Sequence, residues 1–184
     1  IEEEFEVLVA DLGWLKTKSG QPIHGILGFQ FFADYLMQLD SSGGVIRLFQ
    51  GTLPRENNPQ VLRFRLRKGV PFCWISVGEQ AFPLLIDSGF DGGIGLPGRL
   101  KSKIKCYSEP RLTGHLRTAN SQDRRVYTGR LKVDAKLAGF EMVQPPVQFL
   151  EGYRTGVLGS QALKQFIVTF DRRRQRVHFA LPSK

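Results

Sequence analysis

The chain has 184 residues, of which 41% are hydrophobic and 23% charged, a globular composition that excludes a disordered or collagen-like chain. No apolar run reaches the roughly 18 residues of a membrane-spanning helix, so we expect no membrane span. The net charge of +9 is divided unevenly, because residues 1–50 carry 3 Lys or Arg against 7 Asp or Glu, whereas residues 51–184 carry 23 against 10. This division indicates two units of different character.

Short strands dominate the expected structure. The first fifty residues predict strands at 5–9, 36–39 and 45–49, and residues 51–60 predict a turn-rich linker. The strands expected after the linker cover residues 61–67, 72–77, 81–86, 124–137 and 140–150. In this second part of the chain the only helices expected are short and cover residues 97–103 and 161–165. Because Gly, Pro and Phe are frequent and long helical periods are missing, the sequence predicts an all-β fold.

An internal repeat links the two ends of the chain. Gly25-Ile26-Leu27-Gly28 and Gly156-Val157-Leu158-Gly159 share a Gly-x-Leu-Gly pattern at an offset of 131 residues. Both copies continue in register with a short helix, a strand that ends in Asp, a turn and a last strand, which is hard to attribute to chance. The second copy has a long lead-in that the first lacks. We therefore expect residues 1–50 to be the C-terminal part of a first unit and residues 61–184 to be a complete second unit.

The stretch over residues 83–97 carries the strongest chemical signal. The apolar strand Leu84-Leu85-Ile86 leads directly into Asp87-Ser88-Gly89, and a second apolar strand leaves the turn. An aspartate at the end of a buried strand is costly unless hydrogen bonds or a partner carboxylate compensate for its lost hydration. Asp-Ser-Gly is also common in ordinary tight turns, so the tripeptide alone favours a structural turn.

Together with the repeat, this stretch resembles the retropepsin-like aspartic peptidases, especially bacterial members with two such units in one chain. The resemblance is carried by residues 84–90, by Val126-Tyr127-Thr128-Gly129-Arg130-Leu131 and by residues 156–171. It implies an acid-protease (retropepsin- or pepsin-like) fold, in which each unit is a small β-barrel and paired units face each other across a cleft. It also implies a peptide or protein substrate, no cofactor, and a periplasmic or secreted location.

The resemblance assigns roles to individual residues. Asp87 would be one of two catalytic aspartates, Ser88 would join the interlocking hydrogen bonds between two active-site turns, and Gly89 would complete its turn. Residues 156–159 would form the apolar loop beneath that turn. The flap over the substrate would lie within residues 111–127, which are polar and basic rather than glycine-rich, and this departure affects the expected substrate more than the fold.

This chain supplies only one such aspartate. Val9-Ala10-Asp11-Leu12-Gly13 resembles the motif, but Asp11 lies too close to its own Gly-x-Leu-Gly for a barrel to be built in between. We therefore interpret Asp11 as a strand-end or loop residue. The counterpart of Asp87 in the first unit would precede residue 1. The second catalytic aspartate is expected from a missing N-terminal half, from a separate chain after cleavage, or from a symmetric second copy.

The remaining candidate residues give weaker signals. Cys73 and Cys106 are too few for a disulfide scaffold and are either a pair or two buried small hydrophobes. The three histidines, His24, His115 and His178, lack the spacing of a metal site, so we expect no metal.

Two charged features leave alternatives open. Asp91 either supports the turn at Asp87 through hydrogen bonds or has no part in it. Basic residues cluster over residues 99–136, with a net charge of +8, and again over residues 172–176. Clustered positive charge attracts nucleic acids, but no nucleic-acid motif accompanies it. We therefore favour a solvated basic face, or one that attracts acidic substrates, and expect no specific nucleic-acid partner.

Three functional hypotheses follow. The first is an aspartic endopeptidase with Asp87 as one member of its catalytic pair. The second is a catalytically incomplete, peptidase-like module that binds peptides, and the third is a nucleic-acid-binding β-barrel. A second Asp-Thr/Ser-Gly encoded upstream of Ile1 would favour the enzyme, and its absence would favour the module. A salt-dependent affinity for DNA or RNA would favour the third.

Overall fold

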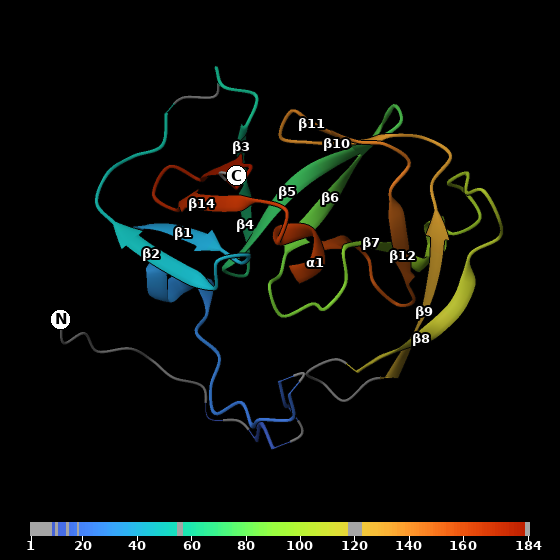
Figure 1. Cartoon of the computed structure of the whole chain (residues 1–184), viewed down its shortest axis with the longest axis horizontal. Coiled ribbons are helices and arrows are strands. Elements are labelled where there is room, and N and C mark those ends of the chain that lie inside the picture. Colours follow the sequence, from blue (N-terminus) through green and yellow to red (C-terminus); the bar gives the residue numbers. More distant parts are fainter. Residues whose placement is uncertain are drawn as a thin grey trace.

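The fold is built almost entirely from short β-strands (Figure 1). The computed structural model describes residues 9, 11–13, 15–17, 19–54, 57–117 and 123–182. Three short helical segments interrupt the strands, at η1 (Phe29–Phe32), η2 (Gly98–Leu100) and α1 (Ser160–Leu163). The all-β prediction is confirmed. The predicted strand at residues 5–9 lies, apart from residue 9, outside the described residues.

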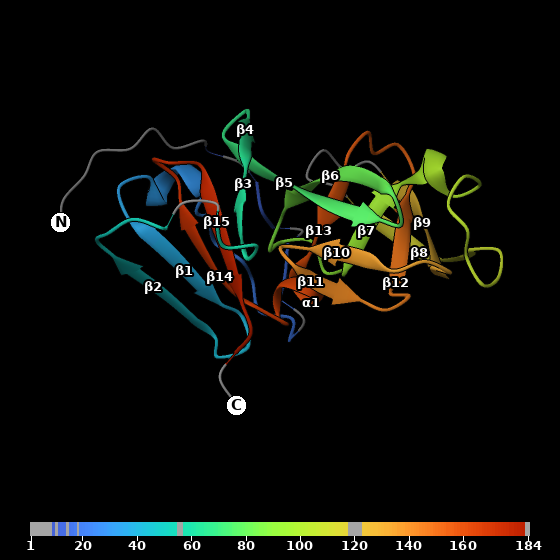
Figure 2. The same ribbon diagram turned by 90° about the horizontal axis from the view of Figure 1, so that it is seen from above.

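One antiparallel sheet joins the two ends of the chain. It has five strands in the order β2-β1-β14-β15-β3. Their bounds are β2 (Val45–Phe49), β1 (Leu36–Asp40), β14 (Ile167–Asp171), β15 (Arg176–Ala180) and β3 (Val61–Arg63). Figure 2 shows this sheet beside the rest of the strands, with β2 at its outer edge. The β1–β2 hairpin is therefore attached to the rest of the protein through β14.

The remaining strands form a larger, strongly curved sheet (Figures 1 and 2). Its order is β11-β10-β5-β6-β13-β7-β12-β9-β8, and β4 also pairs with β5. The bounds are β4 (Arg65–Arg67), β5 (Val70–Val77), β6 (Gln80–Ile86), β7 (Ile94–Pro97), β8 (Arg111–Arg117), β9 (Asp123–Arg130), β10 (Ala135–Leu137), β11 (Phe140–Met142), β12 (Pro146–Leu150) and β13 (Gly156–Leu158). The β5–β6 hairpin confirms the prediction for residues 72–86.

The prediction of a single strand over residues 61–67 is wrong. The structure divides it at Phe64 into β3 and β4, which belong to different sheets. The side chain of Phe64 is 1% exposed, and its N–H donates to the carbonyl of Gln175 at 3.0 Å. Apolar and basic residues alternate without a break from Leu62 to Arg67, although β3 and β4 join different sheets. Periodicity therefore gave no sign of the change of sheet.

The core lies between the two sheets and is filled mainly by aromatic and branched side chains. Phe149 and Phe179 are fully buried, and α1 contributes Leu163, which is 1% exposed. Phe29 of η1 contacts Phe170 edge to face, with ring centroids 5.1 Å apart. Such aromatic pairs stabilise a core beyond the area they bury. Phe29 thus packs against the core that is formed mainly by side chains from residues 61–182.

The described residues include no helix long and apolar enough to span a membrane. They also contain no group of His, Cys, Asp or Glu side chains arranged to hold a metal ion.

The two cysteines differ sharply in their surroundings, and we expect them to differ in reactivity. Both are free; Cys73 is fully buried on β5, and burial raises the pKa of its thiol to about 12, whereas Cys106 is only partly buried. Because the thiolate is the reactive form, iodoacetamide at pH 8 should label Cys106 alone in the native protein. Intact-mass spectrometry should show one addition in buffer and two in denaturant. Two additions in buffer at equal rates would contradict the buried position of Cys73.

Candidate functional site

Strand β6 delivers Asp87 to the end of a buried strand. Leu84 is fully buried and Ile86 is 8% exposed, so the strand is fixed by packing before it reaches the aspartate. It runs parallel to β13, and the N–H of Asp87 donates to the carbonyl of Leu158 at 3.0 Å. The backbone position of Asp87 is therefore set by the second Gly-x-Leu-Gly segment, 71 residues further along the chain.

The three residues singled out from the sequence form one tight turn. The N–H of Gly89 donates to Oδ1 of Asp87 at 2.9 Å, and the N–H of Phe90 donates to the Asp87 carbonyl at 3.2 Å. Asp87 is half-buried, whereas Ser88 and Gly89 are exposed. One carboxylate oxygen of Asp87 thus accepts a backbone hydrogen bond within an exposed turn. This arrangement fixes the carboxylate and leaves the turn accessible to another molecule.

The start of α1 is hydrogen-bonded to the loop that follows Asp87. Gly159 donates to the carbonyl of Gly93 at 2.8 Å, Ser160 to that of Phe90 at 2.8 Å, and Gln161 to that of Gly92 at 3.0 Å. Gly159 is required by close approach, since a Cβ atom there would lie 2.6 Å from the Phe90 carbonyl oxygen. The glycine pattern thus reflects contact between two loops that are distant in sequence.

A hairpin and a small cavity lie next to the turn. The residues predicted as a flap, 111–127, lie within the β8–β9 hairpin, whose connecting residues 118–122 are outside the described residues. A cavity of about 220 Å³ separates this hairpin from the loop after Asp87. Its lining residues are Phe90, Asp91, Gly92, Thr113, Gly114, His115, Leu116, Val126 and Gln148. The space is large enough for a side chain but too small to enclose a peptide.

Tyr153, which interacts with the Asp87 carboxylate, and Arg124 beside it were missed by sequence reasoning. Burial raises the pKa of Tyr153, the Asp87 carboxylate raises it further, and the positive charge of Arg124 lowers it. Tyr153 packs against the buried cluster that contains Phe90 and Val157. It follows Gly152, which has a positive φ of 73° and whose lack of a Cβ atom leaves room for the Arg124 guanidinium. No local motif marks these residues, because they meet only when β9 and the loop after β12 come together.

Other acidic candidates take structural positions. Asp11 lies exposed in a loop, where its Oδ1 accepts the N–H of Gly13 at 2.8 Å. Asp40 and Asp171 end β1 and β14, and their Oδ1 atoms accept N–H groups from Gly43 at 2.8 Å and Arg174 at 3.0 Å. The contact of Asp11 agrees with its interpretation as a loop residue, and Asp40 and Asp171 act as acceptors in the turns that follow their strands. For Asp91, the carbonyl oxygen accepts the Gln161 side chain at 2.8 Å.

Solved protease structures are similar to this chain. A retropepsin-like aspartic protease from Rickettsia conorii has 18% identity, with 65% of this chain and 87% of that chain covered and a TM-score of 0.47. EIAV protease in complex with the inhibitor HBY-793 has 14% identity, coverage of 52% and 86%, and a TM-score of 0.41. The retroviral protease-like domain of Ddi1 from Leishmania major has 14% identity, coverage of 59% and 92%, and a TM-score of 0.37. No protein-family model and no curated protein matches the sequence.

Proposed function

We propose that this chain contributes one aspartate to the catalytic pair of an aspartic endopeptidase. The observation that carries the proposal is the turn at Asp87, in which a buried strand ends in an aspartate fixed by Gly89 and by the carbonyl of Leu158. An ordinary turn needs no such support from a distant Gly-x-Leu-Gly segment. Ser88 and Gly89 are exposed and the β8–β9 hairpin lies next to the loop after Asp87, and in this proposal a second turn and an extended peptide approach from that side.

The proposed chemistry requires two carboxylates close together. At a separation of about 3 Å the two groups cannot both ionise and share one proton. The ionised carboxylate takes a proton from a water molecule as the water oxygen attacks the scissile carbonyl carbon, and the protonated carboxylate polarises the carbonyl oxygen. The C–N bond of the resulting tetrahedral intermediate then breaks as the nitrogen receives a proton. Asp87 is one member of this pair, and Ser88 and Gly89 position its turn against the other.

The second carboxylate comes from outside residues 61–184 in this proposal. Residues 61–184 are a complete peptidase-like unit, residues 51–60 are a linker, and residues 1–50 are the C-terminal part of a preceding unit. Support comes from the sequence, because Asp11 lies only 14 residues before Gly25, too few for a barrel to be built between them. We therefore assign the second aspartate to the missing N-terminal portion of that first unit.

The proposal is tested by peptide hydrolysis in the presence of a competing nucleophile. The product of the complete reading frame that contains this chain should hydrolyse peptides from a diverse library at acidic pH, between the two apparent pKa values of the pair, where the pair holds one proton. Added hydroxylamine should form no hydroxamate, because water attacks directly and no acyl-enzyme exists to intercept. Hydroxamate formation would contradict the mechanism. Peptide binding without hydrolysis would instead support the alternative, a catalytically incomplete peptide-binding module.

A further inference from the structure

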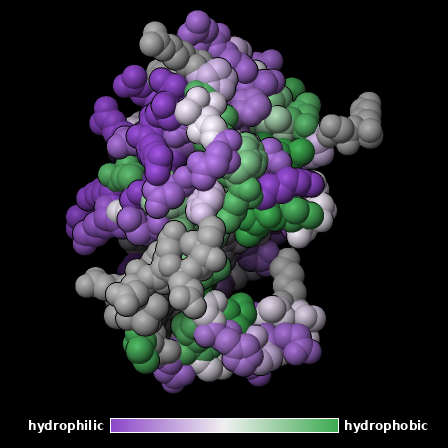
Figure 3. Space-filling model, turned by 90° about the vertical axis from the view of Figure 1, so that its left-hand side faces the viewer, coloured by the Kyte–Doolittle hydropathy of each residue, from purple (hydrophilic) through white to green (hydrophobic). Residues whose placement is uncertain are grey.

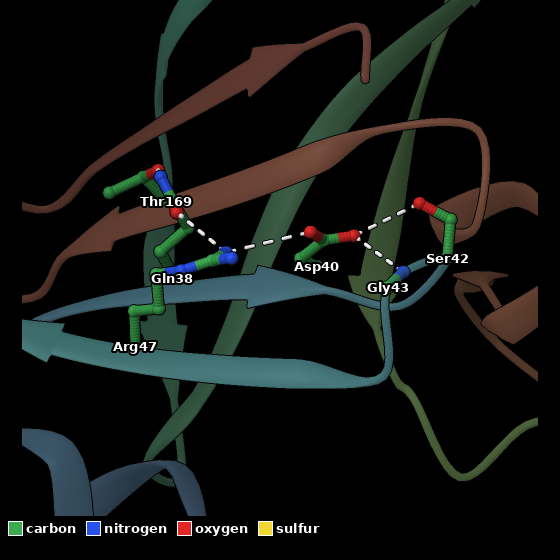
Figure 4. Close-up of polar contacts among 6 residues, drawn as sticks. All are labelled: Gln38, Asp40, Ser42, Gly43, Arg47 and Thr169. Carbon is green, nitrogen blue, oxygen red and sulfur yellow. Dashed lines mark hydrogen bonds and ion pairs between the residues drawn. The ribbon is translucent and has the colours of Figure 1, made fainter. Parts of the chain in front are cut away.

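The five-stranded sheet has an approximate local two-fold arrangement about its centre. In the β1–β14 pair, Leu36 lies opposite Asp171 and Asp40 opposite Ile167, so the register is centred on Gln38 and Thr169. The side-chain amide of Gln38 donates to Oγ1 of Thr169 at 3.3 Å across this centre (Figure 4). Strand β2 flanks β1 in the same way as β15 flanks β14. The two hairpins therefore occupy equivalent places in one sheet.

In the described part of the chain, one face of this sheet is buried at its β15 end and exposed at its β2 end. The register aligns apolar side chains in two rows across the sheet: Ile46, Leu39, Val168 and Phe179 in one, and Leu48, Met37, Phe170 and Val177 in the other. At the β15 end, Val177 and Phe179 are fully buried under the larger sheet. At the β2 end, Ile46 is 55% exposed and Leu48 is 44% exposed. Figure 3 views this side of the molecule and shows hydrophobic residues gathered at its surface.

The two Gly-x-Leu-Gly segments show the same contrast. Val157 and Leu158 are 1% and 0% exposed because β13 lies between β6 and β7. Ile26 and Leu27 are 70% and 67% exposed and lie in no strand. We call the two exposed apolar pairs, Ile26 with Leu27 ahead of η1 and Ile46 with Leu48 on β2, together the open face. An exposed apolar surface of this kind marks an interaction site.

The glycines of these segments indicate what belongs against the open face. A Cβ atom on Gly156 would lie 2.6 Å from the Gly95 carbonyl oxygen, whereas a Cβ atom on Gly25 or Gly28 would meet nothing within 4 Å. In the second unit these glycines allow the neighbouring strand and the aspartate turn to approach closely. In the first unit the same pattern is present without its neighbours. The open face therefore resembles the last strands of a β-barrel without the strands that would pair with them, as β6 and β7 pair with β13.

Building on the proposed function, we propose that the open face binds an incomplete barrel encoded ahead of residue 1 in the same reading frame. This fragment is the counterpart of residues 61–155 and lacks a closing segment of its own. Its aspartate strand pairs with residues 25–27, and the N–H of its aspartate donates to the carbonyl of Leu27, as that of Asp87 donates to Leu158. A further strand pairs with the outer edge of β2, as β3 pairs with β15.

A second copy of this chain does not fit the open face in this way. Its β13 already lies between β6 and β7, and its β14–β15 hairpin already pairs with β1 on one side and β3 on the other. A complete barrel therefore has no vacant place for residues 25–49. Only a barrel fragment without its own β13–β15 equivalent can accept this segment as its final strands.

Hydrogen exchange tests where the fragment binds. The amides of residues 25–27 and 45–49 should exchange at least about tenfold more slowly in the product of the complete reading frame than in this chain alone. The amides of β14 should be protected in both samples. Denaturing mass spectrometry beside native mass spectrometry then shows whether the fragment is continuous with this chain or bound after cleavage. The proposal would be overturned if the product of the complete reading frame gave only a monodisperse 20.8 kDa chain, or only a dimer of two such chains.

A matched pair of variants separates the interface from general stability. Ile46→Glu places a charge on the open face, whereas Val143→Glu places the same charge on an apolar residue that is 69% exposed elsewhere. In the complete protein, Ile46→Glu should remove the protection of residues 25–27 and 45–49, and Val143→Glu should leave it unchanged. Equal protection in both variants would contradict the interface.

The outcomes of the two proposals remain distinguishable. Slowed exchange at the open face without peptide hydrolysis would sustain the interface and remove the peptidase. Peptide hydrolysis with unprotected amides at residues 25–27 and 45–49 would sustain the peptidase and overturn the interface. In that case the second aspartate would have to approach Asp87 from another direction.

Discussion

Replacing Asp87 with Asn should lower kcat/KM for peptide hydrolysis by the complete protein by on the order of 10⁴-fold. An amide cannot take a proton from the attacking water, so the pair loses the group that activates the nucleophile. The fold should remain intact, because Oδ1 of Asn can still accept the hydrogen bond that the Gly89 N–H now donates at 2.9 Å. The measurement is the hydrolysis rate of a fluorogenic peptide, with thermal unfolding recorded on the same sample.

The control for this prediction is Asp34→Asn. Asp34 forms a solvent-exposed ion pair with Arg173 at 2.7 Å, far along the chain from the turn at Asp87. Exposed pairs of this kind contribute at most about 1 kcal/mol to stability. The control variant should therefore hydrolyse the peptide at close to the original rate. Unchanged turnover in the Asp87→Asn variant would exclude Asp87 from catalysis, whatever the control shows.

The elements around Asp87 were predictable because local signals coincide there. The apolar run before the aspartate predicts a buried strand, the Ser-Gly pair predicts a turn, and the structure has β6 followed by a turn with an Asp87–Gly89 hydrogen bond. The hairpin over residues 72–86 was predictable for the same reason, since alternation and a Gly turn agree. Each of these features depends on residues that are close in the sequence.

The errors and omissions concern long-range geometry. The division of residues 61–67 at Phe64 depends on which sheet each half joins, and periodicity carries no such information. The position of Arg124 beside Gly152 and Tyr153 depends on the meeting of β9 with the loop after β12. The sequence pattern Gly-x-Leu-Gly occurs twice, yet only one copy is a strand in the structure. A strand needs neighbours, and residues 25–28 have none of those that surround β13.

Gly159→Ala should destabilise the chain by about 2–3 kcal/mol and lower its Tm by roughly 5–10 °C. The added Cβ atom would lie 2.6 Å from the Phe90 carbonyl oxygen and 2.5 Å from Cδ1 of the Phe90 ring. A flexible side chain could move away, but a backbone carbonyl held by the Ser160 N–H at 2.8 Å cannot do so without moving the loop. Differential scanning calorimetry gives the Tm directly.

The matched control is Gly28→Ala, at the equivalent position of the first Gly-x-Leu-Gly segment. Gly28 has φ −71° and ψ 157°, which alanine adopts readily, and a Cβ atom there would meet nothing within 4 Å. In this chain alone the change should be neutral, or stabilising by up to about 1 kcal/mol through the loss of unfolded-state freedom. In the complete protein the same change should be destabilising, because the proposed barrel fragment would bring a loop against Gly28 as close as the one against Gly159. Equal behaviour of the Gly28→Ala variant in both proteins would mean that no such loop is present.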